Sequence, residues 1–142
     1  MRFFPVKWLA IGVVSMALSV SAVPTLPTIN TANVFNITSY GANVANADNA
    51  VNIQNAITAA AAASGGGTVE IPPGIFLSGP LTMKSKVNLQ IDAGAILRML
   101  PYDQYPGGIT NPPNFIYANK VNDIEISGSG AIDGQGAPWW PG

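Results

Sequence analysis

The chain has 142 residues, of which 48% are hydrophobic and only 9% are charged, and its formal net charge is −1. This length fits one domain, and the near-neutral charge offers no basic surface for a nucleic acid or an anionic membrane. The sequence contains neither Cys nor His, so it has no disulfide and no credible zinc, haem or iron–sulfur site. The scattered carboxylates also lack the spacing of a calcium loop. We therefore expect no metal and no cofactor.

The first 22 residues have the layout of a secretory signal peptide. Arg2 and Lys7 form a basic start, residues 8–20 are an apolar run, and small residues precede a cleavage position after Ala22. A membrane-spanning helix needs about 20 apolar residues, which is more than this run offers, so cleavage is favoured over an anchor. We expect a secreted protein, extracellular or periplasmic, with no membrane association after cleavage.

One amphipathic helix is predicted after the polar loop at residues 43–48. Asp48 is the candidate N-cap, because its carboxylate can accept the free backbone N–H groups of the first turn. Gly65–Gly67 should end the helix. Its predicted apolar face consists of residues spaced by three and four positions: Ile53, Ala56, Ile57 and Ala60.

Short segments with an apolar residue at every second position follow between Gly65 and Leu100. This alternation is typical of strands that bury one face, and no helical pattern long enough for a βαβ unit lies between them. The residues predicted to be buried are Val69, Ile71, Leu81, Met83, Val87, Leu89 and Ile91. Further strands are predicted at Val34–Ser39, Phe115–Ala118 and Val121–Ser127.

Turn-forming residues separate these segments. They lie at Pro72–Gly74, Ser78–Pro80, Lys84–Lys86, Asp92–Gly94 and Gly128–Gly130, and Tyr102–Pro113 should form a longer loop. A chain that turns every few residues and stacks short strands indicates a parallel β-helix. We predict one such domain over residues 23–142, with the helix covering its first hydrophobic end.

Four stretches of the chain resemble the polygalacturonases, the pectin-degrading glycoside hydrolases of family 28. They are Phe35–Ala42 (FNITSYGA), Ile53–Ile57 (IQNAI), Gly65–Leu100 and Ile124–Trp140 (IEISGSGAIDGQGAPWW). The IDGQG segment followed by two tryptophans is the most specific of these features. The loop at residues 43–48 departs from the family, which usually has an acidic GDG-then-TD pattern there. The match is to the amino-terminal third of these enzymes.

The resemblance implies an all-β fold, a right-handed parallel β-helix, and hydrolysis of α-1,4-galacturonosyl linkages with inversion. Inversion needs a general acid and a carboxylate base about 6.5–9.5 Å apart. In the family these are aspartates of an N-T-D motif and a D-D pair, followed by G-H-G and R-I-K motifs. None of the four motifs occurs in this sequence. We therefore assign no catalytic, cofactor-binding or metal-binding residue.

This pattern is interpreted as the N-terminal part of a longer secreted polygalacturonase, incomplete at its C-terminus. The chain alone should be inactive, the whole enzyme should be a monomer, and its partner should be pectic polysaccharide. Two alternatives stay open: a non-catalytic carbohydrate-binding or cell-surface module, and another pectic β-helix enzyme such as a rhamnogalacturonan hydrolase or a pectate lyase. A lyase would normally require a calcium site.

The remaining polar and aromatic candidates have structural interpretations. Asp123 and Glu125 should share one face of a strand, where a carboxylate pair is conceivable but solvation is more typical. Asp92 and Asp133 are predicted turn residues, and Asp103 lies in the long loop. The pair Trp139 and Trp140 could stack on a sugar, although packing is favoured. Asn36 begins a glycosylation sequon, Asn-Ile-Thr.

Overall fold

A computed structural model describes residues 12–14, 17 and 21–140 of the chain. The predicted signal peptide, residues 1–22, falls largely outside these residues and stays a prediction. Within the described part of the chain, no helix has both the length and the apolar character needed to cross a membrane.

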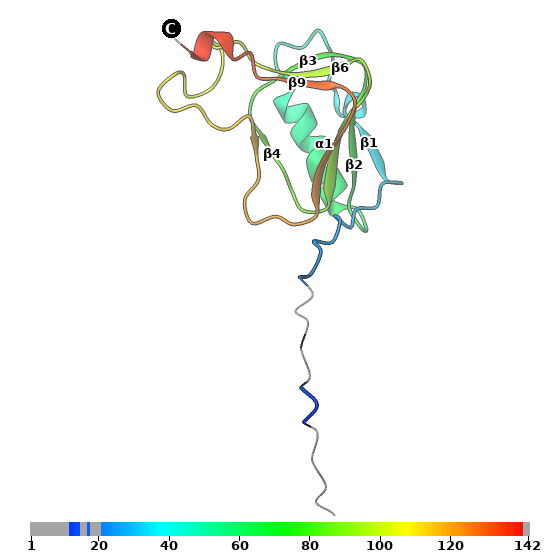
Figure 1. Cartoon of the computed structure of the whole chain (residues 1–142). Coiled ribbons are helices and arrows are strands. Elements are labelled where there is room, and N and C mark those ends of the chain that lie inside the picture. The colour runs from blue at the N-terminus through cyan, green and yellow to red at the C-terminus, as the bar shows by residue number, and fades with distance from the viewer. Residues whose placement is uncertain (1–11, 15–16, 18–20, 141–142) are drawn as a thin grey trace, which may run out of the picture.

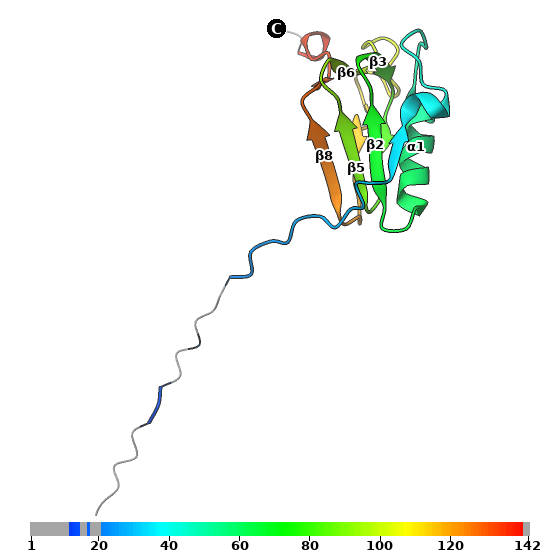
Figure 2. The ribbon, with the colours of Figure 1, turned by 90° about the vertical axis from the view of Figure 1, so that its right-hand side faces the viewer.

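The described residues form short strands in three sheets, and every strand pair is parallel (Figures 1 and 2). The sheet orders are β1-β2-β5-β8, β3-β6-β9 and β4-β7, so from β2 onward consecutive strands enter different sheets. The chain thus passes through the three sheets in the same sequence and returns to the first one. The strands are β1 (Val34–Asn36), β2 (Gly67–Ile71), β3 (Gly74–Ser78), β4 (Leu81–Thr82), β5 (Val87–Ile91), β6 (Ala95–Met99), β7 (Ile116–Tyr117), β8 (Ile124–Gly128) and β9 (Ala131–Asp133).

The core lies between the sheets and contains the residues that the alternation predicted. All seven residues expected to be buried are at most 3% exposed. They are stacked in register, with Val69 of β2 beside Leu89 of β5, and Leu89 beside Ile126 of β8. The prediction of short strands with one buried face is therefore confirmed for this region.

The helix α1 (Ala50–Ala62) packs on β1 and β2, at the opposite end of the first sheet from β8 (Figure 2). The four residues of its predicted apolar face are fully buried. The predicted N-cap is shifted by one position, because Asn49 and not Asp48 occupies it. Asp48 nevertheless accepts a first-turn hydrogen bond from the Ala50 N–H (2.8 Å), and its Oδ1 also accepts one from the Gly79 N–H (2.9 Å).

The helix also ends earlier than predicted. Its last residue is Ala62, and Ala63 takes an extended conformation as C-cap, so the chain leaves the helix before it reaches Gly65. Gly65 instead lies in the turn that leads to β2, and Gly67 is the first residue of that strand.

Three predicted strands are shorter than expected. The strand predicted at Val121–Ser127 is β8, which begins only at Ile124. β1 ends at Asn36, because the Asn36 side chain accepts a hydrogen bond from the Thr38 N–H and starts a 3-10 helix, η1 (Ile37–Tyr40). β7 covers only Ile116–Tyr117. At β1 the hydrogen bond of the Asn36 side chain thus ends the ladder sooner than the apolar pattern indicates.

One corner of the stack repeats from layer to layer. Gly66, Lys86 and Asp123 directly precede β2, β5 and β8, and their φ angles are 79°, 62° and 54°. The layers are tightly stacked here: a Cβ on Gly66 would lie 1.9 Å from the Lys86 carbonyl oxygen. A left-handed corner therefore starts β2, β5 and β8 of the first sheet.

Candidate functional site

The carboxylates that could form a catalytic pair are not brought together on a strand. Asp123 lies before β8 in a left-handed conformation, and its Oδ1 accepts a hydrogen bond from the Thr28 N–H (3.1 Å). Glu125 is exposed within β8. The expectation that these two residues share one strand face is therefore wrong, because the corner turns the chain between them.

The other candidate carboxylates are also separate. Asp92 accepts a hydrogen bond from the Gln90 side-chain amide (2.8 Å), and Asp103 is exposed in the loop after β6. Over the described residues there is no group of three or more acidic side chains that could hold a metal ion. Among the described residues, no hydrogen bond joins one of these candidate carboxylates to another.

The most developed polar arrangement joins β6 to β9. Parallel pairing places Arg98 beside Asp133, and the Arg98 Nε donates to Asp133 Oδ2 at 2.8 Å. The backbone N–H of Gln135 donates to Asp133 Oδ1 (2.9 Å), while its side-chain amide donates to the Met99 carbonyl oxygen. Both oxygens of the Asp133 carboxylate are thus hydrogen-bonded.

These contacts keep the Asp133 carboxylate ionised. The backbone hydrogen bond from Gln135 makes the largest contribution to lowering the pKa of Asp133. Burial has the next largest effect and opposes it, and the hydrogen bond and charge of Arg98 lower the pKa further. A carboxylate with a lowered pKa is suited to fixing a cation and is a poor proton donor.

Sequence reasoning missed this pair because it interpreted Asp133 only as a turn residue. The two residues are 35 positions apart, and only the register of two short strands joins them. The sequence did contain a signal for this pairing. Ala95–Met99 follows the predicted corner at Asp92–Gly94, and Ala131–Asp133 follows the one at Gly128–Gly130, so aligning these two corners would have paired the two strands.

A hollow of about 490 Å³ lies over this ion pair. Its other walls come from the segment after β9, which continues into the 3-10 helix η2 (Ala137–Trp139). The lining residues are Arg98, Asp133, Gln135, Gly136, Ala137 and Pro138. It is a concave surface with one guanidinium, one carboxylate and one side-chain amide.

Aromatic residues adjoin this hollow. Trp139 makes edge-to-face contacts with Tyr102 (4.8 Å between ring centroids) and with Tyr105 (5.9 Å), which joins η2 to the loop of residues 102–113. Tyr105 is buried, which raises the pKa of its hydroxyl, and it donates to the Pro113 carbonyl oxygen. Trp140, by contrast, is 79% exposed. The packing interpretation therefore holds for Trp139 and is wrong for Trp140.

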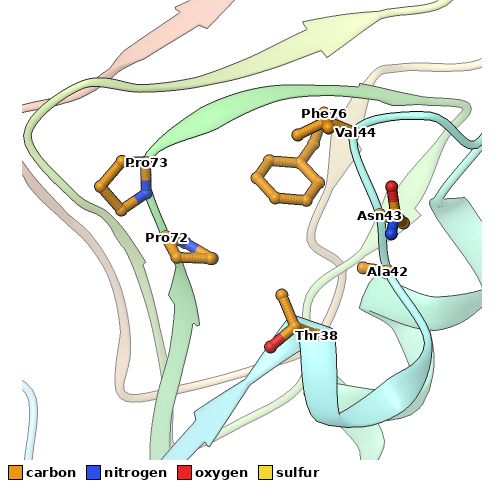
Figure 3. Close-up of a pocket in the computed structure, with 7 residues that line it drawn as sticks. All are labelled: Thr38, Ala42, Asn43, Val44, Pro72, Pro73 and Phe76. Atoms are coloured by element: carbon orange, nitrogen blue, oxygen red, sulfur yellow. The ribbon is translucent and has the colours of Figure 1, made fainter.

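A second hollow, of about 370 Å³, lies between η1 and the turn after β2 (Figure 3). Figure 3 shows Pro72 and Pro73 on one side of it and Asn43 and Ala42 on the other, with Phe76 at the top and Thr38 at the bottom. Its full lining is Thr38, Ala42, Asn43, Val44, Pro72, Pro73 and Phe76. It contains no ionisable side chain and so offers no acid–base chemistry.

No family model matches the sequence, and no curated protein matches it significantly. Several solved structures are similar, including the following three. A "putative glycosyl hydrolase" from Parabacteroides merdae ATCC 43184 has 29% identity and a TM-score of 0.66, over 75% of this chain and 48% of that protein. A hyperthermoactive exopolygalacturonase from Thermotoga maritima has 27% identity and a TM-score of 0.64, over 78% of this chain and 26% of the enzyme.

The third structure is the family 28 exopolygalacturonase of Yersinia enterocolitica, with 34% identity and a TM-score of 0.56, over 72% of this chain and 21% of the enzyme. The chain therefore spans less than half of the length of each of these proteins. The predicted likeness to the polygalacturonase-like glycoside hydrolases of family 28 is therefore confirmed. It extends over about three quarters of the chain.

Proposed function

We propose that the chain forms the N-terminal scaffold of a secreted polygalacturonase-type hydrolase that cleaves α-1,4-galacturonosyl linkages with inversion. The observation that supports this most is the combined structural and sequence similarity to two exopolygalacturonases, at 27% and 34% identity. The proposed architecture is a right-handed parallel β-helix, in which α1 covers the first turn and further turns stack on β8 and β9.

The catalytic residues are proposed to lie in a continuation of the same polypeptide. The described carboxylates supply no acid–base pair, and Asp133 is held ionised by Gln135 and Arg98. The four family motifs are missing from the 142-residue sequence. The shares of the exopolygalacturonases that this chain covers, 26% and 21%, leave room for such a continuation.

Secretion is proposed from the first 22 residues, whose basic start and apolar run suit export. Pectin is a polysaccharide too large to enter a cell intact, so an enzyme that cleaves it would act outside the cytoplasm. Mass spectrometry of the exported protein should find an N-terminus at Val23. Retention of residues 1–22 would contradict this part of the proposal.

The first test is to read the coding sequence after the codon for Gly142. We expect an open frame that encodes the N-T-D, D-D, G-H-G and R-I-K motifs. The extended protein should release reducing ends from polygalacturonate, whereas the 142-residue chain should release none. A variant with Asn in place of the N-T-D aspartate is the matched control and should also be inactive.

A stop codon without these motifs in the frame, or an extended protein that leaves polygalacturonate intact, would contradict the proposal. Binding of polygalacturonate without hydrolysis would instead support the alternative, a carbohydrate-binding module. The anomeric configuration of the first product, followed by ¹H NMR, separates inversion from retention.

A further inference from the structure

The guanidinium of Arg98 is oriented by its neighbours. Its Nε donates to Asp133 Oδ2 at 2.8 Å, and Asp133 is itself fixed by the Gln135 N–H at 2.9 Å. Among the described residues, no hydrogen bond or ion pair involves the Nη1 or Nη2 atom of Arg98. The side chain is 32% exposed and lines the 490 Å³ hollow. One edge of the guanidinium thus fixes its position, and the other edge is available to a ligand.

A planar guanidinium pairs with a carboxylate through two parallel N–H···O bonds, which a lysine ammonium cannot reproduce. The hollow is within the size range of small-molecule sites, and its walls apart from the ion pair are neutral. Gln135, whose amide nitrogen is used by Met99, has a side-chain oxygen that could accept a ligand hydroxyl. This set of groups suits a carboxylate attached to a polyhydroxylated ring.

Trp140 is an independent feature beside the same hollow. Its side chain is 79% exposed, and a Cβ on Gly136 would lie 3.3 Å from its Nε1 atom. The preceding residue, Trp139, packs on Tyr102 and Tyr105 and anchors the backbone there. An exposed indole next to a polar hollow can place its apolar face against the C–H face of a sugar ring.

We propose that Arg98 and Trp140 together form a binding subsite for a uronic acid residue, with Arg98 on the carboxylate and Trp140 against the ring. The inference rests on the proposed function, because it gives a uronate-containing polymer as the natural ligand. Asp133 carries a negative charge in the same hollow, so the attraction for an anion is modest. We expect a Kd on the order of 1 mM for a single subsite.

The test is a titration of the whole chain with α-1,4-linked trigalacturonate, followed by tryptophan fluorescence and by ligand-observed saturation-transfer NMR. The matched ligand is the fully methyl-esterified trimer, which has the same rings and no charge. We expect the acid to bind at least tenfold more tightly than the ester. Triglucuronate, tested in parallel, reports whether the subsite distinguishes the sugar or only its carboxylate.

Three variants locate the site. Arg98→Lys retains a cation for Asp133 but not the planar fork, and should weaken acid binding about tenfold while leaving ester binding unchanged. Trp140→Ala should weaken the binding of both trimers. Lys84→Ala removes an exposed cation outside the hollow and should change neither. Thermal unfolding followed by circular dichroism identifies any variant that has lost its fold.

Equal affinity for the acid and the ester, an unchanged affinity in the folded Arg98→Lys variant, or no binding at all would overturn the inference. Its failure is distinguishable from failure of the proposed function. If the extended protein hydrolyses polygalacturonate while Arg98→Lys binds normally, only the subsite is wrong. If binding depends on Arg98 and no hydrolysis occurs, only the enzymatic function is wrong.

Discussion

The two ends of the strand stack have the same internal geometry but different burial. Leu89 and Leu97 are fully buried, whereas their register partners Ile126 and Ile132 are 50% and 43% exposed. At the β1–β2 end the helix α1 covers the layer, and no described helix or strand lies on the outer edge of β8 or β9 (Figure 2). Pointing toward the core is therefore not sufficient for burial, because a neighbouring layer must also supply the contacts.

The polar side chains also differ between the two ends of the strand stack. The covered end has a hydrophobic core with a few buried hydrogen-bonded polar side chains, such as Asn49, which donates to the Leu77 carbonyl oxygen. The less covered end holds the Arg98–Asp133 ion pair and the exposed Trp140. An ion pair that keeps contact with water avoids most of the desolvation cost of a buried pair.

The largest loss of stability is expected from a substitution in the tight corner before β2, at the end of the stack that α1 covers. Gly66→Ala would place a methyl group 1.9 Å from the Lys86 carbonyl oxygen in a residue with φ of 79°. We expect a loss of about 2–6 kcal/mol in the free energy of unfolding, since left-handed strain and overpacking each cost about 1–3 kcal/mol. Urea unfolding of the whole chain measures it. Gly134→Ala, where no atom lies within 4 Å of the added Cβ, should stay within about 0.5 kcal/mol of the wild type.

The second effect compares the two ends directly. Leu89→Ala removes a fully buried side chain and should cost about 2–5 kcal/mol. Ile126→Ala removes its half-exposed register partner and should cost at most about 1 kcal/mol. The same denaturant titration compares the two variants. Equal losses would mean that another layer covers Ile126 in solution, which would remove the contrast between the ends.

The smallest effect is the pH dependence of the Asp133 ion pair. Because the pKa of Asp133 is lower in the folded protein than its ordinary value of 3.8, its contribution to stability is present above that pH. The contribution decreases as the pH falls below 3.8 and vanishes below the folded pKa. The difference in melting temperature between wild type and Asp133→Asn should therefore shrink between pH 5 and the acid limit of folding. A difference that grows in acid would contradict this assignment.

Much of the fold could be predicted from local patterns. The spacing of Ile53, Ala56, Ile57 and Ala60 predicted the buried face of α1, and strand alternation predicted which residues of β2 and β5 are buried. Element ends were less predictable. The Asn36 side chain ends β1 early, and the left-handed conformation of Asp123 delays the start of β8. Such ends depend on one hydrogen bond or one dihedral angle, which a hydrophobic period does not encode.

The short alternating strands, the amphipathic helix and the corners could be predicted from the sequence, because they follow from residue-level conformational preferences and periodicity. The contact between Arg98 and Asp133, the packing of Trp139 beside an exposed Trp140, and the exposure of Ile126 and Ile132 became visible only in the folded structure. Each of these outcomes depends on which layer lies next to a residue. Strand register and layer stacking set that neighbour across tens of residues, beyond the reach of any local pattern.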